Sequence, residues 1–223
     1  MRITAENPKT AKPRISIGIA FHSPKQPLRR AVLSALAQSV PGHDVCIIIL
    51  DSSPGRKARG IMGALATHPN VRLLRARARS AYAARNLLIA YAESRIGRLA
   101  WHVRLDADDA FFGRDSLADA FAGVRPWHRI ILAGNRQLTA TGEPVGRNLP
   151  SAALKRRPCL LKRISLMASG KFESELPSCN LIMRAGFGWR YPARKSAEDH
   201  WLVARLLLQL PSASLLIRPV ELV

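Results

Sequence analysis

The sequence predicts an α/β protein in which helices cover both faces of a mainly parallel sheet, giving three layers. Short apolar runs alternate with longer segments of helical period through about the first hundred residues. Two of the runs end at acidic residues, VCIIIL at Asp51 and LAWHVRL at the sequence DADD. Because ligands of such sheets bind outside the carboxyl ends of the strands, the fold class alone directs attention to His22, Asp51 and the segment 106–109.

Each expected element of the first half has its own local signal. Residues 15–21, ISIGIAF, are apolar and partly β-branched, and the breaker HSPKQP follows them. The segment 28–39 repeats apolar residues at helical spacing, and VCIIIL at 45–50 is apolar throughout, as a strand covered on both faces is. A helical stretch at 57–67 precedes the strand VRLLRA, and the Ala-rich helical segment 80–95 precedes the strand LAWHVRL.

The second half of the chain has a less regular pattern. Residues 129–149 indicate strands and turns, and RPCLLKRISLMAS forms a basic, amphipathic stretch. PSCNLIMR predicts a strand, SAEDHWLVARLLLQL a helix with one apolar face, and SASLLIRPVELV a closing strand. No repeat, low-complexity segment or linker interrupts the chain, so we expect a single domain over residues 1–223.

Charge is the unusual part of the composition. The 223 residues include 35 Lys and Arg against 15 Asp and Glu, a formal net charge of +20. Such a field attracts nucleic acid, anionic membranes or phosphorylated substrates. The three cysteines lack metal-site spacing, which favours a reduced, intracellular setting. We find no secretory signal and no apolar run near the roughly 18 residues of a membrane helix, and expect a soluble or membrane-peripheral protein.

Acidic residues are scarce, so their clustering is informative. Asp106, Asp108 and Asp109 follow one expected strand, and Glu198 and Asp199 begin a late helix. Adjacent carboxylates repel unless a cation or proton is shared, and hard oxygen ligands of this kind suit Mg²⁺ or Mn²⁺. The alternatives are a solvated acidic turn and ordinary helix-start charge. The sequence has no P-loop, no Gly-x-Gly-x-x-Gly after the first strand, no Gly-x-Ser-x-Gly elbow and no EF-hand loop.

These segments, taken in order, resemble family 2 glycosyltransferases of the GT-A fold. The resemblance covers roughly residues 14–210 and is carried by five short motifs. They are Ser34 with Gln38, Asp51, Ala84-Arg85-Asn86, Leu105-Asp106-Ala107-Asp108-Asp109, and Glu198-Asp199. Each motif is weak alone, but five in the family's order and spacing are specific. The resemblance implies a Rossmann-like sandwich with a nucleotide-sugar-binding half over 1–110 and an acceptor-binding half over 111–223.

The resemblance also implies roles for individual residues. The nucleotide-binding set would be Phe21, His22, Asp51, Arg85, Asp106, Ala107 and Asp108. Within it, Asp51 would bind the base, Arg85 would lie beside the base or phosphates, and Asp108 with Asp106 would bind Mn²⁺ or Mg²⁺. Asp199 would be the catalytic base of an inverting transfer, supported by Glu198. At a helix start the dipole would keep Asp199 ionised.

Three further residues are expected on the acceptor side. Trp189 and Tyr191 precede the base and are placed to stack on an acceptor sugar, and Asn180 occupies a position where relatives line the acceptor pocket. The chain departs from the family pattern at Ile19-Ala20-Phe21-His22 and at Asp51-Ser52-Ser53-Pro54. Both departures lie on the nucleotide side, so they affect the identity of the base more than the reaction.

The resemblance predicts a metal-dependent transfer from a nucleotide sugar, with a UDP-sugar favoured, to a glycan or lipid-linked acceptor in bacterial polysaccharide or lipopolysaccharide synthesis. The setting would be cytoplasmic, peripheral on the inner membrane face. A basic patch of Lys155, Arg156, Arg157, Lys162 and Arg163, interleaved with leucines, would meet anionic lipid, or form a solvated face. The alternatives are a sugar nucleotidyltransferase and a non-catalytic polyanion-binding protein; nucleic-acid-binding motifs are absent.

Overall fold

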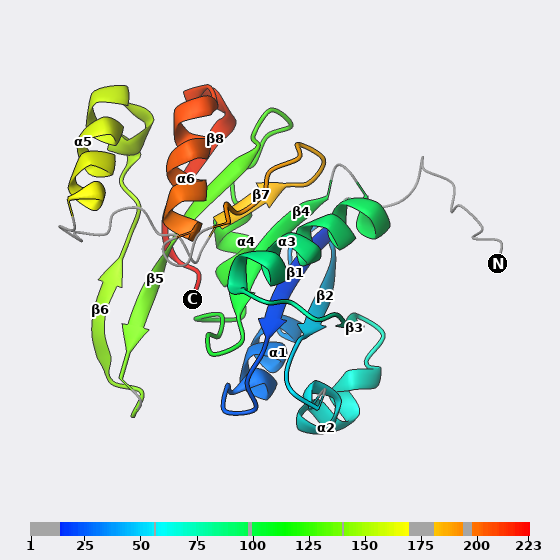
Figure 1. Cartoon of the computed structure of the whole chain (residues 1–223). Coiled ribbons are helices and arrows are strands. Elements are labelled where there is room, and N and C mark those ends of the chain that lie inside the picture. Colours follow the sequence, from blue (N-terminus) through cyan, green and yellow to red (C-terminus); the bar gives the residue numbers. More distant parts are fainter. Residues whose placement is uncertain (1–13, 56, 98–99, 140, 170–180, 194–197) are drawn as a thin grey trace.

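The structure, a computed structural model, describes residues 14–55, 57–97, 100–139, 141–169, 181–193 and 198–223 (Figure 1). Its strands are β1 (Arg14–Phe21), β2 (Asp44–Asp51), β3 (Val71–Arg75), β4 (Trp101–Asp106), β5 (Ile130–Leu138), β6 (Pro144–Asn148), β7 (Leu181–Arg184) and β8 (Leu215–Glu221). Its α-helices are α1 (Leu28–Leu36), α2 (Ala58–Met62), α3 (Ala81–Tyr91), α4 (Ser116–Phe121), α5 (Arg157–Ala168) and α6 (Glu198–Gln209).

The strands of the described residues form one sheet in the order β3-β2-β1-β4-β7-β5-β6, with β8 paired to β5. β3, β2, β1 and β4 are mutually parallel, whereas β7 is antiparallel to both β4 and β5. The predicted α/β architecture with a mainly parallel sheet is therefore confirmed. β1 lies between β2 and β4, so the chain changes direction across the sheet at β1, where the carboxyl ends of the strands open a crevice.

Helices cover both faces of the sheet, and successive side chains of its central strands pack alternately against one helical layer and the other. In β2, Ile47 and Ile49 pack in the same core cluster as α1, whereas Ile48 and Leu50 pack with α3 on the opposite face. A third apolar cluster joins α6 to β5 and β7. The amphipathic period of the expected helices and the all-apolar strands thus account for the three layers.

The boundaries expected from the sequence need three corrections. The segment 57–67 is split into α2 and a 3₁₀ turn, Gly63–Thr67, because Gly63 adopts a positive φ of 54° that ends the helix. The segment 80–95 ends in a π-helical turn, Ala92–Ile96. Helix α4 was not anticipated, since its six residues are too few to show a helical period.

A buried histidine lies at the centre of the sheet. His102 on β4 is 3% exposed and its Nδ1 lies 3.0 Å from Ser16 Oγ on β1. Gly18 on β1 makes room for the ring, because a Cβ there would lie 2.6 Å from His102 Cε1. Burial lowers the pKa of His102 to about 4, so the ring is neutral in the folded protein at neutral pH.

We expect this histidine to destabilise the protein as the solution is acidified. The unfolded chain takes up a proton near pH 6.5 and the folded chain only near pH 4, so stability is full above pH 6.5 and is lost as the pH falls between these values. The complete effect corresponds to roughly 3 kcal/mol. Urea unfolding of wild type and His102→Gln from pH 7.5 to 4.5 measures it, with exposed His22→Gln as control. Parallel stability curves for wild type and His102→Gln would contradict the prediction.

Candidate functional site

A cleft of about 390 Å³ opens at the carboxyl ends of β1 and β4, where the direction of the sheet changes. Asp106, Ala107 and Asp108 line it from the end of β4, and His22 lines it from the end of β1. With Arg85, which also lines it, five of the seven predicted nucleotide-site residues therefore share one cavity. The parallel register explains this, because Ala20 of β1 lies opposite Asp106 of β4.

The opposite wall of the cleft is the amino end of α3. Ser80 caps this helix, with its hydroxyl accepting a hydrogen bond from the Ala83 N–H at 3.3 Å. Ser80, Arg79 and Arg85 all line the cleft. A helix amino terminus with two arginines beside it is a favourable place for the phosphates of a ligand.

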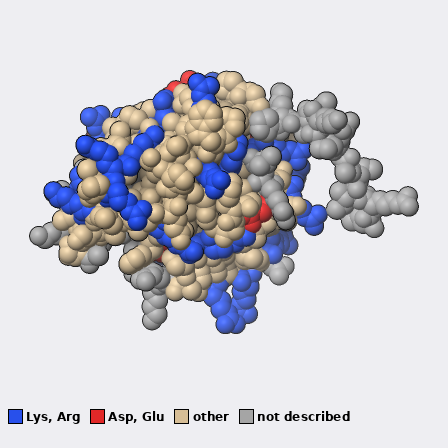
Figure 2. All heavy atoms as spheres, turned by 90° about the horizontal axis from the view of Figure 1, so that it is seen from above, with Lys and Arg blue, Asp and Glu red and all other residues tan. Residues whose placement is uncertain are grey.

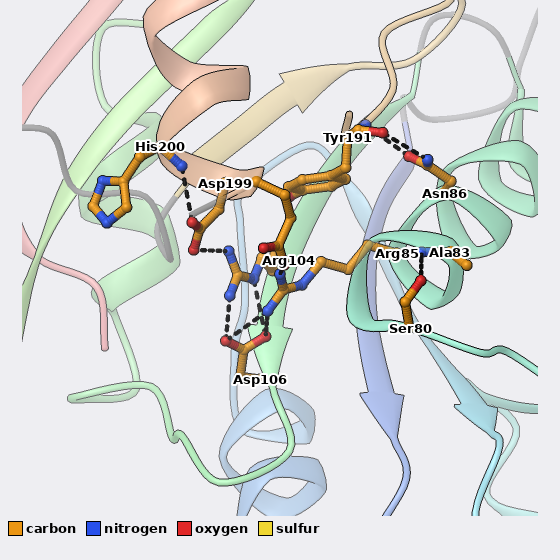
Figure 3. A network of polar contacts seen from close by, with 10 residues as sticks. Ser80, Ala83, Arg85, Asn86, Arg104, Asp106, Tyr191, Asp199 and His200 are labelled. Atoms are coloured by element: carbon orange, nitrogen blue, oxygen red, sulfur yellow. Dashed lines mark hydrogen bonds and ion pairs between the residues drawn. The ribbon is translucent and has the colours of Figure 1, made fainter. Parts of the chain in front are cut away.

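Arg85 belongs to a charged cluster that connects β4 to α6 (Figure 3). Its guanidinium donates to Asp106 at 3.3 and 3.4 Å and to Glu198. Arg104, on β4, donates through Nε to Asp106 Oδ1 at 2.9 Å, through Nη2 to Asp106 Oδ2, and through Nη1 to Asp199 Oδ2 at 3.0 Å. Two arginines therefore join the carboxylate at the end of β4 to the two carboxylates that begin α6.

The arginines of this cluster lower the pKa of two of its carboxylates, Asp106 and Asp199. Burial alone would raise the pKa of Asp199, but the Arg104 guanidinium and the His200 backbone N–H outweigh it and lower the pKa to about 2. Burial of Asp106 is likewise outweighed by Arg104 and Arg85, which lower its pKa. Arg104 is itself 5% exposed, and its acidic partners raise its pKa despite the burial. At neutral pH Asp106 and Asp199 are thus charged, and the pairing with Arg104 makes Asp199 a weaker base than a free carboxylate.

The loop that follows β4 is fixed from behind by the Ser34 and Gln38 motif. The Gln38 amide donates to Gly113 O at 2.7 Å and accepts from the Leu117 N–H at 3.0 Å, and the Phe111 N–H donates to Ser34 Oγ at 3.1 Å. Gln38 is 7% exposed. The motif therefore has a structural basis here: Ser34 on α1 and Gln38 just after it hold the loop carrying Asp108 through hydrogen bonds to main-chain atoms.

Asn86 performs a similar function between α3 and the loop before α6. Its Nδ2 donates to the Tyr191 carbonyl at 3.0 Å, and its Oδ1 accepts from the Tyr191 N–H at 2.8 Å (Figure 3). Tyr191 is 3% exposed, and the Arg85 guanidinium lies 5.6 Å from its ring centroid. The ring packs in the core cluster of α6, so in this structure it offers no face to a sugar.

The structure corrects the positions expected for two nucleotide-side residues. The Asp51 carboxylate is 2% exposed and accepts hydrogen bonds from the Ser53 N–H and hydroxyl and from the Ala58 N–H. It therefore closes the turn into α2, and Ser52 rather than Asp51 lines the cleft. Phe21 is fully buried in the core, and its carbonyl accepts from Ser52. A turn at Ser53-Pro54 directs the acid inward because its oxygens satisfy buried N–H groups.

The acceptor-side expectations are only partly covered by the described residues. Trp189 is half-buried and stacks on Phe187, with ring centroids 5.1 Å apart. Asn180 lies outside the described residues. Glu198 is 8% exposed and engaged by Arg85, whereas Asp199 is more accessible. The roles of these residues toward an acceptor stay predictions.

The most important residue that the sequence interpretation missed is Arg104. Its signal was present in the strand LAWHVRL, where one cation interrupts an otherwise apolar run two residues before Asp106. A buried cation needs an acidic partner, and side chains two apart on a strand share a face, so Arg104 and Asp106 could have been paired from the sequence. Arg79, Gln26 and Ser52, which line the cleft, carried no comparable signal.

The donor set at the end of β4 fits a divalent cation bound together with phosphates. No group of three or more His, Cys, Asp and Glu residues within the described part of the chain forms a ready metal site. Mg²⁺ and Mn²⁺ sites of nucleotide enzymes, however, use one or two carboxylates plus substrate phosphates. Asp108 is exposed in the cleft, and burial together with Asp106 and Asp108 raises the pKa of Asp109 to about 6. This excess of negative charge is what a cation would neutralise.

Comparison with known proteins addresses the family directly. Residues 16–121 match the family model described as glycosyl transferase family 2. No curated protein matches the chain. Among solved structures, TarS 1-349 of S. aureus in complex with UDP superposes with a TM-score of 0.62 at 17% identity, covering 87% of this chain and 55% of that chain. TarS 1-349 with UDP-GlcNAc gives 0.60 at 16% identity, covering 85% and 52%.

These similarities cover the chain unequally. The family match ends at α4, whereas the structural similarity extends over most of this chain. This chain spans about half the length of the TarS 1-349 structures. The shared fold confirms the GT-A-like architecture, with its mainly parallel central sheet. Residues 16–121, a little under half of the chain, match glycosyl transferase family 2, and this match is consistent with the shared fold.

Proposed function

We propose that this chain transfers a sugar from a nucleotide-diphosphate donor to a hydroxyl group of an acceptor, with inversion at the anomeric carbon. The observation that carries the proposal is the single cleft in which Asp106 and Asp108 face the amino end of α3, with Asp199 joined to its edge through Arg104. It supports the proposal because groups that would bind a diphosphate line the cleft and a carboxylate that would accept a proton is bonded to it through Arg104.

The donor diphosphate would lie between Ser80, Arg79 and Arg85 on one side and the end of β4 on the other. Asp108, with Asp106, would hold Mn²⁺ or Mg²⁺, which when bound neutralises charge that develops on the leaving diphosphate. A UDP-sugar is favoured, in keeping with the UDP and UDP-GlcNAc complexes of TarS. Asp51 is withdrawn from the cleft, so His22 and Ser52 would contact the base.

Asp199 would accept the proton of the attacking hydroxyl. Its carboxylate is ionised at neutral pH, and it lies in the first turn of α6, where the helix dipole favours negative charge. Glu198, engaged by Arg85, would hold that turn against the donor half. One base and one displacement imply inversion of configuration. The acceptor would be a glycan or a lipid-linked sugar of a cell-surface polysaccharide or lipopolysaccharide.

Binding of the donor nucleotide tests this function without knowledge of the sugar. In a thermal-shift series with UDP, GDP and dTDP, we expect one diphosphate to raise the melting temperature in the presence of Mn²⁺ and to do so much less in EDTA. A ligand at 100 times its Kd stabilises the folded state by about 2.7 kcal/mol. AMP and inorganic phosphate serve as controls. No stabilisation by any of the three diphosphates would reject the proposal.

We also propose that α5 and the turn before it place the enzyme on the cytoplasmic face of an anionic membrane. Lys155, Arg156 and Lys162 are exposed, and Leu161 between them is 49% exposed. Figure 2 shows Lys and Arg atoms gathered at the left of that view, on the side where α5 lies in Figure 1. Within the described residues no helix is long and apolar enough to cross a bilayer. Basic residues flanking an exposed leucine suit a lipid surface.

Replacing Lys155, Arg156 and Lys162 with Gln is expected to weaken binding to vesicles containing phosphatidylserine. Each lost charge costs about 1 kcal/mol near an anionic surface, and added salt weakens the wild-type protein in the same way. Arg157 is left unchanged because it donates to the Leu208 carbonyl at 2.7 Å. The matched control replaces Lys57, Arg59 and Arg75, beside the opposite edge of the sheet, and loses the same charge. The proposal that α5 binds the membrane would be contradicted if both triple variants lost the same vesicle affinity, or if wild type bound neutral and anionic vesicles equally well.

A further inference from the structure

Arg104 connects the two functional carboxylates of the site. Its Nε and Nη2 both bond to Asp106, and its Nη1 bonds to Asp199 at 3.0 Å (Figure 3). The guanidinium is planar and its N–H directions are fixed relative to one another. Because Asp106 holds the Arg104 guanidinium at two nitrogens, the Nη1–H that bonds to Asp199 points in a fixed direction.

The position of Arg104 on the sheet makes it a rigid support. β4 pairs with β1 on one side and β7 on the other, and the Arg104 side chain is 6% exposed. A cation at this depth is costly unless it is paired and hydrogen-bonded. Within the described residues, carboxylates from β4 and from the first turn of α6 pair with it. The arginine therefore fixes the distance between the end of the donor strand and the helix that carries the proposed base.

Asp199 has few other supports within the described residues. Apart from Arg104, its carboxylate accepts from the His200 N–H at 2.8 Å, a bond inside its own helix. Glu198 binds Arg85 rather than Arg104. Asp106, in contrast, keeps bonds from Arg85 at 3.3 and 3.4 Å if Arg104 is removed. Substitution of Arg104 should thus leave the Asp199 carboxylate much less restrained in position than the Asp106 carboxylate.

We propose that Arg104 is a positioning residue that holds the Asp199 carboxylate at a fixed place relative to the donor-side Asp106. The inference rests on the proposed function, since it assigns Arg104 a role in the same transfer. Arg104 touches neither the acceptor nor the donor in this role; it acts through Asp199. A lysine at this position would keep the charge but lose the planar fork that reaches both carboxylates.

A double-mutant cycle tests this role. Arg104→Gln, Asp199→Asn and the double variant are compared with wild type for kcat and for donor affinity. We expect Arg104→Gln to lower kcat by about 10- to 100-fold, the usual loss when the partner that orients a functional group is removed. Donor affinity should change by less than about threefold, because Arg85 still holds Asp106. In the Asp199→Asn background the Arg104 substitution should cost almost nothing further.

Other variants separate positioning from mere stability. Arg104→Lys should recover only part of kcat, and Arg136→Gln, which removes an arginine from an ion pair with Glu221 outside the cleft, should leave kcat unchanged. Losses of kcat that multiply in the double variant would mean that Arg104 does not act through Asp199. A fall in donor affinity as large as the fall in kcat would assign Arg104 to the donor instead. Either result overturns the proposal.

A cycle of melting temperatures makes the test independent of substrate. If Arg104 and Asp199 are in contact as described, each single variant leaves one charged group unpaired. The sum of the two single-variant decreases in melting temperature should therefore exceed the decrease in the double variant. Additive shifts would overturn the positioning role even for an inactive protein. Failure of wild type to bind any nucleoside diphosphate would instead reject the proposed function, so the two failures are distinguishable.

Discussion

Replacing Asp199 with Asn should lower the rate of sugar transfer by about 10²–10⁴-fold, the usual contribution of a positioned general base. Nucleotide and metal affinity should be retained, because Asp199 does not line the donor cleft. Asn has nearly the size of Asp and is well tolerated at helix starts, but it cannot take up the acceptor proton. The assay compares single-turnover transfer with donor binding measured by calorimetry.

The control for this variant is Asp119→Asn, which alters an exposed carboxylate on α4 outside the cleft. Both variants should melt within a few degrees of wild type, although Asp199→Asn also loses part of its bond to Arg104. Wild-type transfer by Asp199→Asn would remove the base from this position. A collapse of nucleotide affinity would instead assign the residue to the donor.

Replacing Asp108 with Ala should eliminate the Mn²⁺ dependence of nucleotide binding and weaken that binding by at least about 10²-fold. Removing a residue that hydrogen-bonds to a metal ligand typically lowers metal affinity by about 10–100-fold, so removing a ligand itself should lower the affinity by at least as much. The fold should be unaffected, because the Asp108 side chain is exposed and the hydrogen bond that the residue accepts, from Arg30 at 2.6 Å, goes to its main-chain carbonyl. Calorimetric titration of the preferred nucleoside diphosphate, with Mn²⁺ and in EDTA, measures both effects.

Asp115→Ala is the matched control, since Asp115 is exposed, lies at the end of the loop between β4 and α4 and does not line the cleft. It should bind nucleotide and Mn²⁺ as wild type does. If folded Asp108→Ala protein kept its metal-dependent affinity, the metal would have to be held elsewhere, and the assignment of the β4 end would be wrong. Equal losses of nucleotide affinity in Asp108→Ala and Asp115→Ala would mean that removing any one negative charge near the site has this effect.

The central sheet and the position of the cleft could be predicted because their signals are local. Apolar runs such as VCIIIL mark covered strands, and parallel strands bring their carboxyl ends to one edge, so DADD and His22 had to be neighbours. The arrangement of Glu198 and Asp199 against β4 depends on contacts across 95 or more residues. No spacing rule reaches that far, so the partners of Arg104 across the site required the structure.

Two side chains, one predicted on the nucleotide side and one on the acceptor side, lie elsewhere for a different reason. Asp51 was expected to face the ligand because it ends a strand, but the turn that follows supplied three hydrogen-bond donors and drew the carboxylate inward. Tyr191 was expected to stack on an acceptor sugar, but its loop is bound to α3 and its ring packs in the core cluster of α6. In both cases a competing hydrogen bond or packing partner decided the orientation of the side chain.

The hydrogen bonds from Asn86 have a consequence for engineering. Asn86 bonds to the amide N–H and the carbonyl of residue 191, so these two bonds do not depend on which side chain stands there, whereas the Tyr191 ring packs in the core cluster of α6. A loop of different composition could therefore be grafted before α6 and still dock, provided that it keeps an aromatic side chain at this position and its main chain passes the same point. Under the proposed function, changes elsewhere in this loop would alter acceptor preference without touching the residues that line the cleft.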